Sequence, residues 1–167
     1  MKPARRIAVY PGSFDPITLG HRDILARMAP SFDRVVLLIS RNRAKGGLFT
    51  PEERAHLARE ALKDLPGVEV DIHAGLTVDY VKKIGAGVIL RGLRAVTDFE
   101  YELVMANMNK KLAPEIETMI VFASPEFYYV SSNTVKEVAL HGGKVSDLVP
   151  IGVENALIAK YRSLPAE

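Results

Sequence analysis

The residues best placed to do chemistry lie near the amino terminus, between Tyr10 and His21. This segment holds two prolines, two glycines and several small polar side chains between a short apolar run and a helical pattern. Gly12 and Gly20 would let the backbone approach a ligand closely, and Ser13 offers a hydroxyl. Because the first N–H groups of a helix are unpaired, a helix beginning near His21 predicts an anion site, with the ring as a further donor. An ordinary turn with a surface histidine is the alternative.

Two cations and a second helix start follow further along the chain. Arg91 ends a buried apolar run, and an arginine in that position usually has an anionic partner. Lys45 follows another apolar run and could bind an anion, but a solvated surface lysine is an equally good interpretation. Ser131 and Ser132 begin a helical pattern and could cap that helix, contact a phosphate, or do both.

The composition limits the remaining classes of function. The 167 residues carry 22 Lys and Arg against 20 Asp and Glu, with a net charge of +2, and contain no cysteine. The lack of cysteine excludes a thiol nucleophile, a redox pair, an iron–sulfur cluster and cysteine-ligated zinc, and we expect a cytoplasmic protein. The apolar runs Val35–Ile39 and Met119–Ala123 are far shorter than the ~20 residues of a membrane span. Interspersed charges argue against nucleic-acid binding, so we expect one globular domain over residues 1–167 without nucleic-acid or membrane partners.

Alternating strand and helix patterns would position these residues. Short runs, all interpreted as near-continuously apolar, predict a parallel sheet covered on both faces. Helical patterns fill the gaps, the clearest being the capping box from Thr50 to Glu53 with Pro51 at the first helical position. The expected strands are Ile7–Tyr10, Arg34–Ser40, Val68–Ile72, Val88–Leu90 and Thr118–Ala123; the other expected helices start near His21 and cover Thr77–Ile84, Asp98–Leu112, Ser132–His141 and Val153–Leu164.

This order predicts an α/β fold with a doubly wound, Rossmann-like, five-stranded parallel sheet and helices on both faces. In such folds ligands bind beyond the carboxyl ends of the strands. The positions to inspect are therefore those that follow Tyr10, Ser40, His73, Arg91 and Ala123. The helical stripe of Met105, Met108 and Leu112 could serve an interface, but core packing is the commoner role.

Four ordered motifs resemble one known family. Thr18-Leu19-Gly20-His21 resembles the (H/T)xGH signature of the nucleotidyltransferase superfamily, and the preceding Tyr-Pro-Gly-Ser-Phe-Asp-Pro resembles its bacterial phosphopantetheine adenylyltransferase branch. Three later segments fit that family in order and spacing: Lys45–Arg54, Ile89–Glu102 and Val130–Val138. Leu19 replaces the usual asparagine. Asn133 replaces a third serine, although an amide can still donate to a phosphate.

The resemblance implies transfer of an adenylyl group from ATP to 4′-phosphopantetheine, without a covalent enzyme intermediate. The products would be dephospho-coenzyme A and pyrophosphate, in the penultimate step of coenzyme A biosynthesis. The implied catalytic residues are His21, Ser13, Lys45 and Arg91, with His21 donating to the α-phosphate. Phosphopantetheine would be contacted by Ser13, Lys45, Arg91 and Thr77, and Thr77 is also expected to cap its helix. The implied ATP contacts are Ser13, Phe14, Gly20, His21, Gly92, Leu93, Arg94, Glu102, Phe127, Tyr128, Tyr129, Val130, Ser131, Ser132 and Asn133.

The resemblance also implies a homohexamer, coenzyme A as a feedback ligand, and Mg²⁺ carried by ATP. The sequence shows no carboxylate cluster arranged to hold a metal, and its four histidines lack ligand spacing. A phosphate-loop kinase is disfavoured because G-x-x-x-x-G-K-[ST] is missing, and a nicotinamide dehydrogenase because no glycine fingerprint follows the first strand. Two alternatives stay open: a non-catalytic module that senses ATP or coenzyme A, and another nucleotidyltransferase of the same superfamily.

Overall fold

A computed structural model describes residues 6–41 and 46–163 of the chain. In this part of the chain the strands form one parallel sheet in the order β3-β2-β1-β4-β5. The chain runs outward from the centre through β2 to β3, then returns to the other side of β1 for β4 and β5, which is the doubly wound arrangement. The expected fold class is confirmed. The strands are β1 Ile7–Gly12, β2 Arg34–Ser40, β3 Val68–His73, β4 Val88–Leu93 and β5 Glu117–Phe122.

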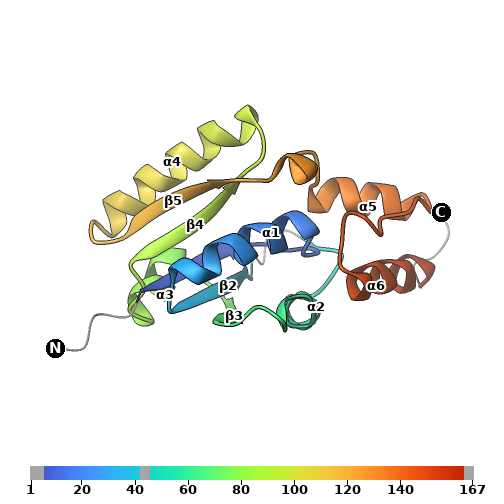
Figure 1. Ribbon diagram of the computed structural model, residues 1–167, viewed down its shortest axis with the longest axis horizontal. Helices are drawn as coiled ribbons and strands as arrows, with labels where there is room; N and C mark the ends of the chain where they lie inside the picture. Colours follow the sequence, from blue (N-terminus) through green and yellow to red (C-terminus); the bar gives the residue numbers. More distant parts are fainter. Residues whose placement is uncertain (1–5, 42–45, 164–167) are drawn as a thin grey trace.

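Helices connect these strands and cover both faces of the sheet (Figure 1). Two starts are fixed by capping boxes, in which Thr18 pairs with His21 and Thr50 pairs with Glu53. The cap expected at Thr77 is wrong, because Leu76 occupies the N-cap position and makes no side-chain hydrogen bond. The helices are α1 Leu19–Met28, α2 Pro51–Leu62, α3 Thr77–Lys83, α4 Val96–Leu112, α5 Ser132–Leu140 and α6 Ile151–Arg162, with short 3₁₀ turns at Ala29–Ser31 and Pro125–Phe127. No helix in the described ranges is long and apolar enough to cross a membrane.

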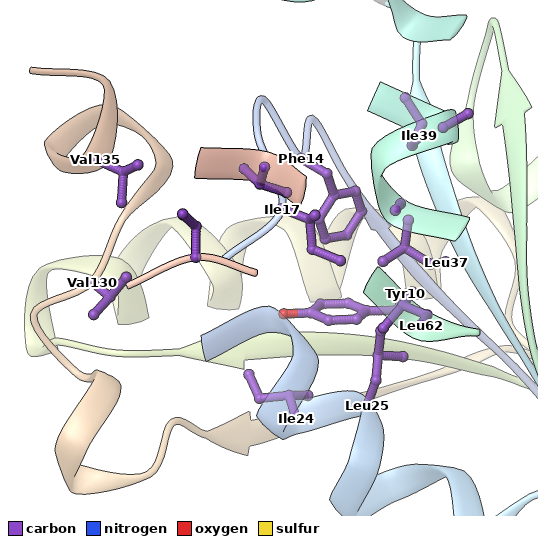
Figure 2. Close-up of a cluster of buried hydrophobic side chains, with 14 of the residues drawn as sticks. Tyr10, Phe14, Ile17, Ile24, Leu25, Leu37, Ile39, Leu62, Val130 and Val135 are labelled. Atoms are coloured by element: carbon purple, nitrogen blue, oxygen red, sulfur yellow. The ribbon is translucent and has the colours of Figure 1, made fainter. Parts of the chain in front are cut away.

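The core lies in two layers, one on each face of the sheet. On one face, Tyr10, Leu37 and neighbouring strand residues pack against α1, α2, α5 and α6, and Figure 2 shows Phe14 and Ile17 of the β1–α1 loop in the same cluster. On the other face, residues such as Val9 and Ile89 pack mainly against α3. This burial anchors the central strands, so their carboxyl ends present the connecting loops in fixed positions.

The two edge strands differ from the expected pattern of burial. Residues of β1 and β2 are buried almost without interruption, but in β3 the charged Glu69 and Asp71 are exposed between partly buried valines. β5 alternates in the same way. The prediction of a near-continuous apolar strand is therefore wrong for β3. β5 is largely apolar as predicted, but the expected cover on both faces is wrong for both strands, because each is a sheet edge that helices cover incompletely.

Helix α4 is unusually exposed. Glu102 is its only buried residue, whereas Met105, Met108 and Leu112 have exposed fractions of 36%, 51% and 45%. The expected core role of these three side chains is wrong for a single copy of the chain. Val104 on the same helix and Phe122 on the edge strand β5 are exposed as well.

Candidate active site

A polar pocket opens at the carboxyl ends of β1 and β4, where the chain reverses the direction in which it adds strands. The β1–α1 loop, the end of β4 and the N-terminus of α5 form its walls. This is the position where doubly wound sheets bind ligands. The lining residues are Tyr10, Pro11, Gly12, Ser13, Phe14, His21, Arg91, Gly92, Arg94, Asp98, Glu102, Ser131, Ser132 and Asn133.

Two further pockets adjoin the polar pocket and share walls with it. One continues past Ser13 and Arg91 to Thr77 and the inner side of α4, where Tyr101, Met105 and Asn109 line it among other residues. The other, smaller pocket lies beneath His21 and Arg94 and is closed by Gly20, Phe127 and Val130. Of the residues expected to bind ligands, Leu93 is buried and Tyr128 and Tyr129 are largely exposed, and none of these three lines the pockets described here.

His21 is held in one orientation by the start of α1. The backbone N–H of Thr18 donates to Nδ1 of His21 at 3.0 Å, and the Thr18 hydroxyl lies 3.0 Å from the same atom. Because Nδ1 accepts, the neutral ring carries its proton on Nε2. Desolvation, reinforced by the nearby Arg94 and Arg91, lowers the pKa of His21 to about 4. Near neutral pH the side chain is therefore an uncharged N–H donor.

The β1–α1 loop also packs against the His21 ring. Phe14 adopts φ = 45°, in the left-handed region that non-glycine residues rarely occupy. Its buried ring packs edge-on against His21, with 5.0 Å between centroids. A Cβ atom at Gly12 would lie 3.0 Å from the Phe14 ring, so glycine is needed where the strand passes this side chain. Phe14 thus positions His21, besides lining the pocket.

Arg91 has the anionic partner that its position predicted, and that partner is Glu102 of α4. Arg91 Nε donates to Glu102 Oε2 at 2.7 Å and Nη2 donates to Oε1 at 2.6 Å, while Nη1 donates to the Pro11 carbonyl at 2.7 Å. Burial opposes the charge of Arg91, but the hydrogen bonds and charge of Glu102 outweigh it and raise the pKa of the guanidinium. Of its five N–H groups, two remain for a ligand.

The N-terminus of α5 forms the opposite wall. The Ser131 hydroxyl accepts from the Thr134 N–H at 2.9 Å, and the Ser132 hydroxyl donates to the Pro16 carbonyl at 2.7 Å. Ser131 therefore caps α5, and Ser132 ties the helix to the β1–α1 loop. α1 and α5 both begin at this pocket, so the positive ends of two helix dipoles face it. At the start of α1, the Leu19 N–H already donates to the Leu148 carbonyl and the His21 N–H to the Thr18 hydroxyl.

Some site features could not be assigned from sequence. Asp98 lines the pocket and pairs with Arg94 at 3.3 Å, and Arg94 also donates to the Val130 carbonyl at 3.1 Å. Little in the sequence signals this pair, because Arg94 precedes the helix that carries Asp98. Burial raises the pKa of the Tyr10 hydroxyl, which also faces the pocket. Lys45, expected at this site, lies outside the described residues.

The pocket favours an anion and offers no ready metal cage. Its arginines are paired with Glu102 and Asp98, which leaves both carboxylates engaged. Over residues 6–41 and 46–163, no group of three or more His, Asp or Glu side chains is arranged to hold a metal ion. The arrangement supplies N–H donors to a phosphorylated ligand, while in the described part of the lining the charges of two arginines and two carboxylates balance.

Comparisons with known proteins agree with this geometry. The family model for cytidylyltransferase-like domains matches residues 9–138. The phosphopantetheine adenylyltransferase of Bdellovibrio bacteriovorus is 58% identical over 94% of this chain and 98% of its own. That of Thermotoga neapolitana is 54% identical over 93% of this chain and 97% of its own. The solved nicotinic acid mononucleotide adenylyltransferase of Plasmodium falciparum, in complex with NaAD, covers 95% of this chain and 97% of its own with a TM-score of 0.70; at 14% identity it shows the shared fold alone.

Proposed function

The chain belongs to the phosphopantetheine adenylyltransferase family, and from this premise we propose how its site transfers the adenylyl group of ATP to 4′-phosphopantetheine. The enzyme is a nucleotidyltransferase of coenzyme A biosynthesis that yields dephospho-coenzyme A and pyrophosphate. The observation that carries the proposed site is the neutral His21 ring, with its proton on Nε2, in a pocket between Arg91 and the start of α5.

The three pockets correspond in chemistry to the parts of the two substrates. The polar pocket suits the triphosphate, because two helix N-termini and Arg94 line it. The smaller pocket, closed by Phe127 and Val130, has a volume of about 50 Å³ and would hold only part of the adenosine. The pocket along α4, with Met105 and Asn109, suits the mixed apolar and amide character of the pantetheine arm.

The shared wall marks where the reacting phosphates would meet. Ser13 and Arg91 line both the polar pocket and the pocket along α4, so each can touch both substrates. In the reaction a phosphate oxygen of phosphopantetheine attacks the α-phosphorus of ATP. The new P–O bond forms as the bond to the bridging oxygen breaks, and its electron pair leaves with pyrophosphate. Because the nucleophile is already anionic, the protein's work is alignment and charge stabilisation.

His21 would donate from Nε2 to a non-bridging oxygen of the α-phosphate. With a pKa near 4 in the ligand-free protein, the ring is neutral near pH 7 and would meet the α-phosphate as an N–H donor that stabilises charge. Arg91 would offset the charge of the attacking phosphate with the two N–H groups that Glu102 and Pro11 leave unused. Lys45 and Thr77 keep their proposed roles as phosphopantetheine contacts, the latter on the wall of the pocket along α4.

Magnesium is proposed to enter with ATP. The donor set fits a metal held by the triphosphate rather than by the protein, since the carboxylates of Asp98 and Glu102 are each paired with an arginine. A bound Mg²⁺ would neutralise phosphate charge, and the side chains around it would orient the oxygens.

A homohexamer, feedback by coenzyme A and a cytoplasmic location are also proposed. Exposed apolar side chains on α4, among them Val104 and Met108, support self-association, because isolated copies would leave this surface in water. Coenzyme A contains both a pantetheine arm and an adenine nucleotide, so it could occupy the pockets proposed for both substrates. No nucleic-acid or membrane partner is proposed.

Pyrophosphate release tests the proposed function. The wild-type protein is mixed with Mg-ATP, with and without 4′-phosphopantetheine, and compared with His21→Ala. We expect release that depends on phosphopantetheine and falls on the order of 10²-fold or more in the variant, because a preorganised donor is lost. Replacing phosphopantetheine by nicotinic acid mononucleotide should give no release. Binding of ATP and coenzyme A without release would favour the sensing module, and release with the alternative acceptor would favour another nucleotidyltransferase.

A further inference from the structure

A buried carboxylate lies just behind the phosphate pocket and is not accounted for by the proposed chemistry. Asp15 follows Phe14 in the β1–α1 loop and has an exposed fraction of 5%. It does not line the pockets described above. Burying a carboxylate is costly unless hydrogen bonds and opposite charges compensate it, so its partners show what it holds.

Three segments that are distant in sequence converge on this carboxylate. Oδ2 accepts from the Leu48 N–H at 2.9 Å, and Oδ1 accepts from the Phe49 N–H at 2.9 Å. Lys136 of α5 lies 3.3 Å from Oδ2, and Arg54 of α2 lies 3.4 Å from Oδ1. Both oxygens therefore receive one backbone donor and one cation.

Arg54 connects Asp15 to the backbone of Ser13, which lines the polar pocket. Its Nη1 donates to the Ser13 carbonyl at 3.3 Å and its Nε donates to the Phe49 carbonyl at 2.7 Å. Gly47 passes so close that a Cβ atom there would collide with the Arg54 guanidinium and lie 2.8 Å from Asp15 Oδ2. Arg54 is itself buried, with an exposed fraction of 8%. The side chains of Asp15 and Arg54 are therefore closely packed against the backbone at Gly47.

Lys136 ties the opposite wall to the same carboxylate. It lies on α5, one turn beyond the pocket-lining residues at the start of that helix. A second tie joins the same two segments, because the Ser132 hydroxyl donates to the Pro16 carbonyl at 2.7 Å. Two contacts therefore fix the distance between the β1–α1 loop, which carries Ser13, and the start of α5.

We propose that Asp15 is a positioning residue for adenylyl transfer, which holds Ser13 and the N-terminus of α5 at the separation that the phosphates require. This inference rests on the proposed function. One carboxylate faces the two cations Arg54 and Lys136, so the cluster carries a net positive charge behind an anion site. Removing the carboxylate would both loosen the two walls and leave the buried Arg54 and the partly buried Lys136 without the negative charge between them.

Three variants and the wild type test this role through kinetics. In Asp15→Asn the amide NH₂ group would face the Leu48 or Phe49 N–H, donor against donor, and both ion pairs would be lost. Because a misplacement of about 1 Å can cost roughly 10²-fold in rate, we expect kcat to fall by that order. Lys136→Met removes only the tie to α5, so kcat should fall about 10-fold while the KM for phosphopantetheine changes less than about 2-fold. Lys136→Arg keeps the ion pair and should restore most of kcat.

A double variant separates positioning from simple loss of stability. If Lys136 acts through Asp15, then Asp15→Asn with Lys136→Met should be about as slow as Asp15→Asn alone, because the tie can be broken only once. Leu157→Ala is the matched control, since it opens a cavity under α6 without touching the pocket. It should lower Tm and leave kcat unchanged at a temperature well below Tm. Arg34→Met, which breaks an ion pair with Glu69 at the opposite end of the sheet, should leave kcat unchanged.

The outcomes are distinct. If Asp15→Asn and Lys136→Met turned over at the wild-type rate and lowered only Tm, the positioning role would be overturned and the proposed function would stay intact. Multiplicative losses in the double variant would also overturn it, because the two residues would then act independently. A wild-type protein that releases no pyrophosphate would overturn the proposed function and, with it, this inference. The losses, the rescue and the non-additivity described above would together support it.

Discussion

Arg91 and Glu102 form a two-fold hydrogen-bonded ion pair, with N–O distances of 2.7 and 2.6 Å, at the wall shared by the polar pocket and the pocket along α4. Both oxygens of Glu102 are used in this pair. Glu102, which the family resemblance implies as an ATP contact, therefore orients an arginine in the structure. A bidentate pair fixes the plane of the guanidinium, and so the direction of its remaining N–H groups.

Glu102→Gln should disturb catalysis through Arg91. An amide can accept from only one guanidinium nitrogen, so Arg91 loses its fixed plane and a buried charge loses its partner. We expect kcat to fall about 10-fold, with the KM for phosphopantetheine raised and the KM for ATP nearly unchanged. Steady-state kinetics with each substrate varied in turn measure this split.

Glu69→Gln is the matched control for that variant, because Glu69 pairs with Arg34 at an exposed sheet edge. Its kinetics should equal those of the wild type, since exposed ion pairs contribute little. If Glu102→Gln instead raised the KM for ATP alone, the carboxylate would be a direct nucleotide contact, and the ion pair with Arg91 would be secondary.

The pKa of His21 predicts how stability depends on pH. The pKa is lowered from 6.5 to about 4 in the folded protein, so the unfolded chain binds the extra proton more readily. Stability from this group is complete above pH 6.5 and is lost as the pH falls toward 4. Because proton binding is linked to unfolding, the free energy of unfolding should fall by about 1 kcal/mol between pH 7.5 and pH 5.5. Urea unfolding at both pH values measures it.

The free energy of unfolding of His21→Gln should differ less between pH 7.5 and pH 5.5 than that of the wild type. The other histidines are common to both proteins, so the difference between wild type and variant isolates His21. Equal pH dependence in the two proteins would mean that the ring is not desolvated in the folded state. Turnover by the wild type should also lack an inflection near pH 6.5 from this group, because the ring stays neutral there.

The sequence was sufficient for the features that depend on neighbouring residues. Buried runs such as Val35–Ile39 and the capping box from Thr50 to Glu53 are local signals, and both lie where they were expected. The fold class predicted ligand binding beyond the carboxyl ends of the strands and pointed to all five ends alike. The strand order of the structure distinguishes the ends of β1 and β4, where the order reverses. The interpretation of Thr77 as a cap failed because a threonine at the first helical position has the same local sequence signal as one at the N-cap.

The remaining features depend on contacts between distant segments. Asp15 meets Phe49 and Lys136 only after the sheet and α5 have assembled, so no spacing in the sequence could show that cluster. The alternation in β3 was visible as Val68-Glu69-Val70-Asp71, but its meaning depends on β3 being an edge. The exposure of α4 likewise depends on how little of the rest of the chain packs against it, which its own sequence does not reveal.

Gly92→Ala should destabilise the protein and impair the pocket at once. A Cβ atom at this position would lie 2.7 Å from Ile24 Cδ1 and 2.9 Å from the Tyr10 hydroxyl oxygen. Because Ile24 and Tyr10 are buried in the main core, the strand must shift, at a cost of about 1–3 kcal/mol. Thermal unfolding together with the KM for ATP measures both effects.

Gly87→Ala is the matched control at the start of the same strand, where a Cβ atom would meet nothing within 4 Å. It should leave the KM for ATP unchanged and shift the unfolding free energy by less than about 0.5 kcal/mol. Equal effects of the two alanine variants would contradict a packing constraint specific to Gly92.

The exposed apolar surface of α4 predicts that a charge placed there will separate the subunits of the proposed hexamer. Val104 and Met108 lie one turn apart on this helix, with exposed fractions of 62% and 51%. If copies of the chain cover them, Val104→Glu or Met108→Glu buries an unpaired carboxylate at the interface, which is strongly unfavourable. Light scattering coupled to gel filtration should then show smaller species than the wild type at the same concentration.

Ile158→Glu on α6 is the control, because its side chain has a comparable exposed fraction of 43% outside the α4 surface and should leave the mass unchanged. A wild-type protein that stays monomeric across a wide concentration range would contradict the hexamer and leave the apolar face of α4 to a different partner.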